Sequence, residues 1–130
     1  MILRIDFDSE VPIYIQIKNQ VIEGIAKGDI EKDEELPSVR ALAEDIGVNM
    51  HTVNKAYTIL KEEGYIKIDR RKGAIVSLNL DQSKERFKEE LNDNLYYYMA
   101  QCFNRSIDKD EIKKYIDKVF LDFHKGEGEK

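Results

Sequence analysis

The sequence predicts a mostly α-helical chain that contains one small β-hairpin and divides into two parts near residue 80. Apolar residues recur at three- and four-residue spacing through most of the chain, which is the period of amphipathic helices. Residues 65–76 change to short β-rich segments around a polar turn. A length of 130 residues allows one compact domain, or one small domain with an appendage.

Composition excludes several classes of protein. The net charge of −5 argues against a uniformly basic nucleic-acid coat protein, although residues 46–79 carry six basic and three acidic side chains and form the only net-positive third. A polyanionic partner would meet this third, while chance variation is the competing interpretation. One cysteine and two histidines give neither a disulfide framework nor the usual metal spacings. Acidic residues within the first ten positions argue against a secretory signal, and no apolar run reaches the ~18 residues that span a bilayer. We therefore expect a cytoplasmic protein without metal, cofactor or membrane association.

The first 36 residues predict an arm or strand, a helix and a loop. Leu3, Ile5 and Phe7 alternate with charged residues, which indicates a short strand or an extended arm. Pro12 suits the first turn of a helix, which we expect over residues 12–27 and which Gly28 would end. Residues 29–36 are acidic and predicted to form a loop.

Residues 38–63 predict two short helices joined by a tight turn. Ser38 is suited to cap the first helix and Asn49 the second, and each helix has one apolar face. Gly47 and Gly64 are suited to end them. A glycine turn between two short amphipathic helices is typical of the helix-turn-helix motif.

A hairpin and two further helices follow. The apolar segments at 65–68 and 74–76 flank a turn with three consecutive cations, Arg70, Arg71 and Lys72, and such a hairpin behind a helix-turn-helix is a wing. From about residue 82 the helical period returns, Asp108 suits a cap before a last helix, and residues 126–130 are expected to fray. We thus predict a winged helix-turn-helix in residues 1–79 and a helical dimerisation tail in residues 80–130.

The second helix of the motif carries side chains suited to reading DNA. Its apolar side would pack on the first helix, so His51, Asn54 and Lys55 would face outward near the helix start, where base contacts are made. Asn pairs with adenine, and His or Lys reaches guanine or phosphate. A solvated polar face is the competing interpretation of each feature alone, but these features fall together within about 40 residues.

These residues resemble the GntR family of bacterial winged-helix regulators between Pro12 and Val76. The match includes Leu36-Pro-Ser-Val-Arg-Ala-Leu-Ala43, Gly47-Val-Asn49, Thr52-Val53, Ala56-Tyr57, Glu62-Glu-Gly-Tyr-Ile66 and Gly73-Ala-Ile-Val76. The resemblance implies that Ser38 and Arg40 touch the backbone or a base at the groove entrance, and that Gly73 lies at the wing. The candidate DNA-binding residues are therefore Ser38, Arg40, Asn49, His51, Thr52, Asn54, Lys55, Arg70, Arg71, Lys72 and Gly73.

The short tail resembles the YtrA-like branch of that family, in which the tail dimerises and the regulated genes often encode transporters. Independently, two helices cannot bury so many large apolar groups alone, and pairing two tails would cover them. The candidate dimer residues are Leu95, Tyr98, Met99, Phe103, Tyr115, Val119, Phe120 and Phe123. The alternative is that these rings pack on the winged-helix domain. Cys102 is expected to be a buried apolar residue, with redox sensing as the weaker alternative.

The leading hypothesis is a homodimeric, sequence-specific DNA-binding regulator, a repressor acting on a palindromic operator. The alternative is a winged-helix protein-interaction module that does not bind DNA, which the acidic total and the acidic segment at 29–35 favour. An enzyme is not expected, because no nucleophile with a base, no metal cluster and no phosphate-cradling glycine loop occurs in the sequence. The sequence identifies no small-molecule effector.

Overall fold

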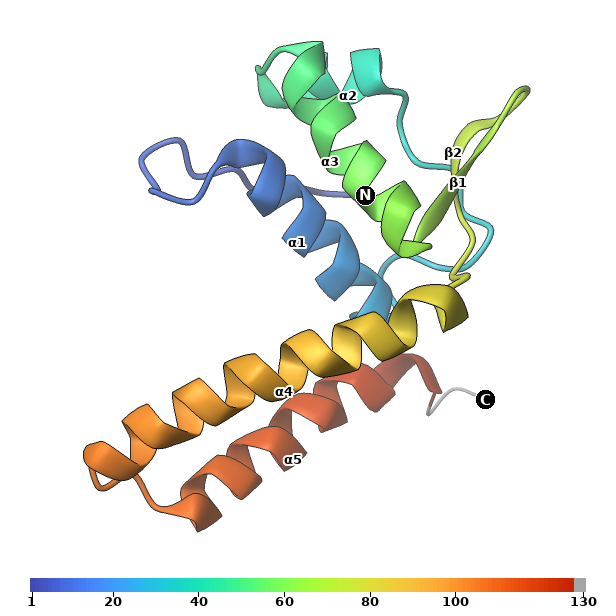
Figure 1. Cartoon of the computed structure of the whole chain (residues 1–130). Coiled ribbons are helices and arrows are strands. Elements are labelled where there is room, and N and C mark those ends of the chain that lie inside the picture. Colours follow the sequence, from blue (N-terminus) through green and yellow to red (C-terminus); the bar gives the residue numbers. More distant parts are fainter. Residues whose placement is uncertain (128–130) are drawn as a thin grey trace. The chain divides into compact units, whose positions relative to one another are not determined.

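The computed structural model describes residues 1–127, with side chains described to residue 123 (Figure 1). It confirms the predicted fold class, since helices predominate and the two strands form an antiparallel hairpin. Two compact units divide the chain, residues 1–82 and the remainder from Ser83. The elements in chain order are α1 (Ile13–Lys27), α2 (Val39–Ile46), α3 (Met50–Glu63), β1 (Ile66–Asp69), β2 (Gly73–Val76), α4 (Asp81–Asn104) and α5 (Lys109–Glu127).

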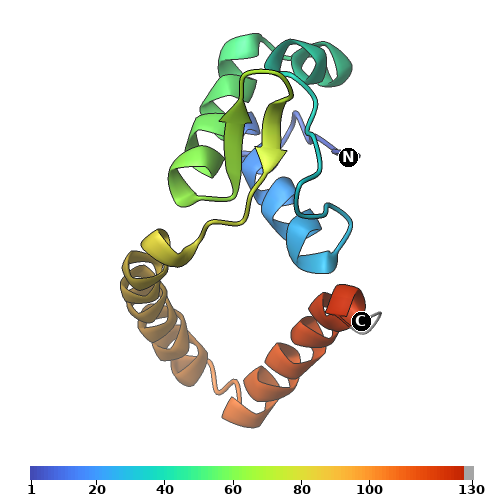
Figure 2. The ribbon, with the colours of Figure 1, turned by 90° about the vertical axis from the view of Figure 1, so that its right-hand side faces the viewer.

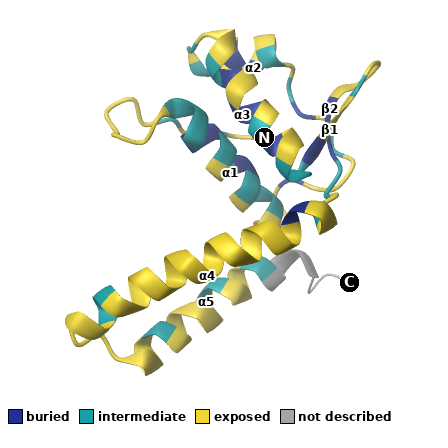
Figure 3. Cartoon of the chain, viewed as in Figure 1, coloured by how far each residue is buried: buried dark blue, intermediate teal, exposed yellow. Residues whose placement is uncertain are grey.

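The hydrophobic core of the first unit is built around α3, which contacts α1, α2 and β1. The largest of its fully buried side chains are Ile17 and Val21 from α1, Val53 and Leu60 from α3, and Val76 from β2. Buried residues in Figure 3 gather on the inner faces of these elements. Because one side of α3 is used for this packing, its opposite side is left for solvent or a ligand.

Local signals start and end the helices as predicted. The Ser38 hydroxyl accepts a hydrogen bond from the Ala41 N–H at 3.0 Å, and the Asn49 side chain accepts one from the Thr52 N–H at 2.9 Å. Both contacts satisfy donors that the first helical turn leaves free. Gly64 ends α3 with φ +96°, and an added Cβ would lie 1.9 Å from the Asn79 carbonyl oxygen. The chain that leaves the hairpin therefore runs directly against the end of α3.

The hairpin gains a third backbone segment from the acidic region before α2. Within the hairpin, Ile66 pairs with Val76 and Asp69 with Gly73. On the other edge of β2, the Leu36 N–H donates to the Ala74 carbonyl at 2.8 Å and the Val76 N–H to the Glu34 carbonyl at 3.0 Å. Residues 29–36 form neither a helix nor a strand, as predicted, but Glu35 makes an isolated bridge with Ile75 and the second half of this loop lies along β2.

The N-terminal segment is an extended arm and not a strand. Gln20 donates from its side chain to the Arg4 carbonyl at 2.7 Å and accepts from the Arg4 N–H at 2.8 Å. Gln16 forms the same pair of bonds with the backbone of Asp6, each at 2.9 Å. Glutamines one turn apart on α1 thus replace a strand partner for the arm.

The second unit consists of the long helices α4 and α5. They diverge from the connecting turn in Figure 2. The Asp108 carboxylate accepts a hydrogen bond from the Asp110 N–H at 3.4 Å, in agreement with the predicted cap. Of the tail expected to fray, residues 126 and 127 still belong to α5, and residues 128–130 lie outside the described part. None of the helices within residues 1–127 is long and apolar enough to cross a membrane.

Candidate nucleic-acid interface

The outward side of α3 carries three of the predicted DNA-binding side chains. His51, Asn54 and Lys55 are exposed, since the opposite side of the helix is buried against α1 and α2. Asn49 is exposed too, but its amide oxygen is engaged by the cap, where it also accepts from the Thr52 hydroxyl at 3.1 Å. Thr52 is half-buried. These two residues therefore first organise the start of the helix, and only their remaining polar atoms are available to a ligand.

Tyr57 fixes α3 to the beginning of α2. Its ring is buried, and its hydroxyl donates a hydrogen bond to the Pro37 carbonyl at 2.7 Å. Burial raises the pKa of this phenol far above its usual value, so the hydroxyl remains a donor at every physiological pH. Ser38 directly follows the anchored Pro37 and Arg40 lies in the first turn of α2, and both are exposed. The bond thus sets the position of the start of α2 against α3.

Lys55 leans toward α1. Its ammonium nitrogen lies 4.1 Å from the centre of the Tyr14 ring, within the range of a cation–π interaction. The amphipathic pattern that predicts a helix over residues 12–27 gives no sign of this contact. An aromatic residue in the first helical turn was the available signal, but nothing local indicated that α3 would cross there.

The wing tip is held by its own acidic residue. The Asp69 carboxylate accepts hydrogen bonds from the Arg71 N–H at 2.8 Å and the Lys72 N–H at 3.1 Å. These two bonds, with smaller help from the neighbouring cations, lower the pKa of the Asp69 carboxyl. Arg70, Arg71 and Lys72 are exposed, and Gly73 closes the turn with φ +78°. The tip is therefore a shaped turn that presents three cations.

The predicted residues occupy three places in the first unit: the start of α2, the outward side of α3 and the wing tip. In Figures 1 and 2 the hairpin tip reaches the same end of this unit as α2 and the start of α3. One surface thus combines hydrogen-bonding side chains on a helix with cations on a projecting loop. This combination suits a polyanion with readable edges, such as duplex DNA.

The predicted dimer residues lie on helices that do not cover each other. Leu95, Tyr98, Met99 and Phe103 on α4 are exposed, as are Tyr115 and Phe120 on α5, whereas Val119 and Phe123 are half-buried. Phe120 and Phe123 stack edge to face with ring centres 5.8 Å apart. We call the exposed large apolar side chains of α4 and α5 the apolar stripe of the tail. The stripe also includes Phe87, Leu91 and Ile116, which the predicted set omitted although they share its helical spacing. Cys102 is half-buried at the edge of this stripe, which differs from the full burial expected.

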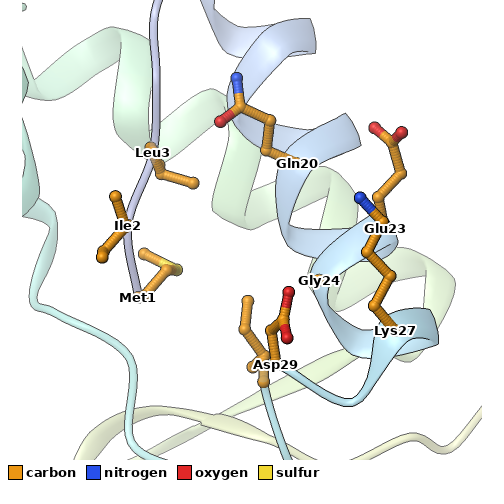
Figure 4. A pocket seen from close by; sticks show the side chains of 9 residues that line it. Met1, Ile2, Leu3, Gln20, Glu23, Gly24, Lys27 and Asp29 are labelled. Atoms are coloured by element: carbon orange, nitrogen blue, oxygen red, sulfur yellow. The ribbon is translucent and has the colours of Figure 1, made fainter. Parts of the chain in front are cut away.

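Two hollows lie outside the surface formed by α2, α3 and the wing. One, of about 430 Å³, lies between the N-terminal arm and the second half of α1, as Figure 4 shows. Its charged lining residues, Glu23, Lys27 and Asp29, are of both signs and favour neither anions nor cations. The other, of about 970 Å³, lies in the angle between α4 and α5 and continues the apolar stripe of the tail.

Comparison with known proteins identifies relatives over the whole chain. Residues 13–76 match the family described as bacterial regulatory proteins, gntR family. The HTH-type transcriptional repressor YtrA of Bacillus subtilis is 31% identical over 125 residues, which cover 95% of this chain and 96% of that protein. The similarity therefore includes the tail as well as the winged-helix unit.

Solved structures agree with the sequence relatives. YtrA from Sulfolobus acidocaldarius, a GntR-family transcription factor, is 40% identical with a TM-score of 0.66, covering 77% of this chain and 99% of that one. The DNA-binding domain of AraR in complex with operator ORX1 is 27% identical with a TM-score of 0.53, covering 59% of this chain and 99% of that one. The similar region of AraR is thus the one that was solved with DNA.

Proposed function

Because the chain belongs to the GntR family of bacterial regulatory proteins, we propose that it acts as a homodimer that binds a palindromic operator and represses transcription. Its relatives are DNA-binding transcription regulators and not enzymes. Membership in the family supports DNA binding itself. The dimer, the form of the operator and the roles of single residues are the parts that we propose.

One observation supports the assignment of the DNA-binding surface. Helix α3 is buried on one side and presents exposed polar side chains on the other, and the cationic turn of the wing lies at the same end of the unit (Figure 1). We assign Asn54 and His51 on α3 to base edges in the major groove, since both lie in the first half of the helix. Ser38, Arg40 and Lys55 are assigned to phosphates beside the groove. Arg70, Arg71 and Lys72, with Gly73 in the turn, would meet the next stretch of backbone or the minor groove.

Asn49 and Thr52 have an indirect part in the proposal. Their side chains bond to each other and to the start of α3, so their main contribution is to aim this helix. The free Asn49 amide nitrogen and the helical N–H groups beside it are polar donors on the same surface, which suits a phosphate oxygen.

The tail supports the proposed dimer. Large side chains such as Tyr98, Phe103 and Tyr115 are exposed on α4 and α5, and exposed apolar stripes of this extent mark interaction surfaces. A second copy has the same stripe, and a twofold pair of subunits matches a palindromic site. Because the hydrophobic gain scales with the apolar area removed from water, exposed Phe103 and Tyr115 would contribute more to such a pairing than Val119 and Phe123, which are already half-buried in one copy.

The cellular role is proposed from the resemblance to the short branch of the family. It points to transporter genes as the regulated genes and to the bacterial cytoplasm as the compartment, since the regulated DNA lies there. Repression is proposed because the matching Bacillus subtilis protein is named as a repressor. Transcript levels of neighbouring transporter genes should rise when the gene for this chain is deleted.

Selection from a random duplex library tests the proposal directly. The parent protein should enrich an inverted repeat, and sedimentation should give the mass of a dimer. If each subunit neutralises about three phosphates, log K should fall with log salt at a slope of about −5. Enrichment of a single half-site by a monomer would refute the dimer and the palindrome. Binding to no duplex at moderate salt would favour the protein-interaction module instead.

A further inference from the structure

The contact between Lys55 and Tyr14 joins α3, the proposed DNA-reading helix, to α1. The Tyr14 ring is half-buried in the first turn of α1, so its position is fixed by packing between α1 and α3. The Lys55 ammonium lies 4.1 Å from the ring centre while the side chain as a whole remains exposed. A fixed ring therefore holds a charge that would otherwise move freely.

A lysine side chain is flexible, and ordering it on a ligand costs conformational entropy. A cation above an aromatic face keeps its N–H donors free on the side away from the ring, because the ring attracts the charge and needs no hydrogen bond. Lys55 can thus be ordered by Tyr14 and still donate to a phosphate oxygen. Ordering before binding increases affinity by lowering the entropy lost on binding.

The direction in which the Lys55 side chain points favours a contact with phosphate over a contact with a base. A side chain that reads bases must extend away from the protein body toward the groove floor, as exposed His51 and Asn54 can. Lys55 instead turns sideways, toward α1, which takes its charge to the flank of α3 where a groove is bordered by phosphates.

We propose that Tyr14 is a positioning residue for DNA binding, which holds the Lys55 ammonium at the flank of α3 so that it meets a phosphate. The proposal rests on the proposed function, because it needs α3 to enter a groove. It makes Lys55 a contributor to affinity for every sequence and Tyr14 a residue that acts only through Lys55.

A double-mutant cycle on mixed-sequence duplex DNA tests it, with Kd measured over a range of salt concentrations. The variants are Tyr14→Leu, Tyr14→Phe, Lys55→Met and the pair Tyr14→Leu with Lys55→Met. Leucine keeps apolar packing without a ring, and phenylalanine keeps the ring. A matched control replaces Lys55→Met by Lys61→Met, since Lys61 is an exposed lysine at the far end of the same helix.

Tyr14→Leu should weaken binding about threefold per subunit, hence about tenfold for a dimer, because a cation–π contact at an exposed site has this strength. Tyr14→Phe should restore parental affinity, and Tyr14→Leu should have no effect once Lys55 is Met. Lys55→Met should reduce the salt slope by about one per subunit. With Lys61→Met, the Tyr14→Leu effect should persist in full.

Three results would overturn the inference while leaving DNA binding intact. Equal losses from Tyr14→Leu with and without Lys55 would make the ring a purely structural residue. Tighter binding by Tyr14→Leu would show that the ring competes with phosphate for the ammonium. An unchanged salt slope in Lys55→Met would remove the phosphate contact. A parent protein that binds no duplex would instead overturn the proposed function, and this inference with it.

Discussion

Replacing Gly64 by Ala should destabilise the protein far more than replacing Gly47 by Ala. Both glycines end a helix in the left-handed region, with φ +96° and +73°, and this conformation costs an L-residue about 1 kcal/mol or somewhat more. At Gly47 no atom lies within 4 Å of an added Cβ, so the backbone term is the whole cost. At Gly64 the Cβ would lie 1.9 Å from the Asn79 carbonyl oxygen, and a backbone atom cannot rotate away.

The additional loss of stability in Gly64→Ala arises because residues 77–79 must move away from the new Cβ. The Asn79 N–H donates to the Gly64 carbonyl at 2.7 Å, and the Ser77 N–H donates to the Tyr65 carbonyl at 3.0 Å. Displacing residues 77–79 weakens both bonds, at about 1 kcal/mol each. We therefore expect a loss of about 3 kcal/mol for Gly64→Ala and about 1 kcal/mol for Gly47→Ala.

Urea unfolding at one fixed protein concentration, followed by circular dichroism, measures the two losses, since association would otherwise shift the midpoints. Losses that agree within about 0.5 kcal/mol would show that residues 77–79 move aside freely, and would refute the reasoning.

The remaining predictions concern the candidate interface. Arg40→Ala should weaken binding to all duplexes, whereas Asn54→Ala should mainly relax the sequence preference, and gel shifts with the selected operator and a scrambled duplex separate these outcomes. Tyr57→Phe should lower the free energy of unfolding by about 1 kcal/mol or more, because the Pro37 carbonyl loses its donor; an unchanged urea midpoint would contradict this. Asp69→Asn should keep the wing turn and Asp69→Ala should lose it, as the amide shifts of the two following residues would report by NMR. The pKa of Asp69 is lowered in the folded state, so its stabilisation of the turn is complete above the ordinary carboxyl pKa and is lost as pH falls through the lowered value; turn shifts that stay constant on acidification would refute this cap.

The features that the sequence predicted correctly are those with a local chemical signature. The side chains of Ser38 and Asn49 accept hydrogen bonds from backbone N–H groups of the first helical turn, and Gly64 tolerates a positive φ. A few residues of sequence were therefore enough to predict where α2 and α3 begin and where α3 ends. The hairpin around the three wing cations is local in the same sense, because its two strands are separated by one turn.

The features that were missed depend on contacts between distant residues. Leu36 and Ala74 are joined by a backbone hydrogen bond. Any residue type can form such a bond, so the sequence of the acidic segment does not predict it. The Gln16 and Gln20 side chains form hydrogen bonds with the backbone of the N-terminal arm. Glutamine is equally common on helix faces that contact only water, so its presence in the sequence does not predict these bonds. The contact of Lys55 with Tyr14 depends on the crossing of two helices, which a helical period does not fix.

The pairing of residues 33–36 with β2 has a mechanical consequence for the proposed function. The same short segment leads directly to Ser38 and Arg40, so the start of α2 and the wing are tied through backbone hydrogen bonds at Asp33, Leu36 and Val76. These bonds connect the segment before α2 to the hairpin, so the two do not depend on side-chain contacts alone for their relative position. If the proposed contacts of α2 and the wing with phosphates are correct, these hydrogen bonds would restrict changes in the distance between the two groups, and DNA with a groove of another width would have to deform on binding.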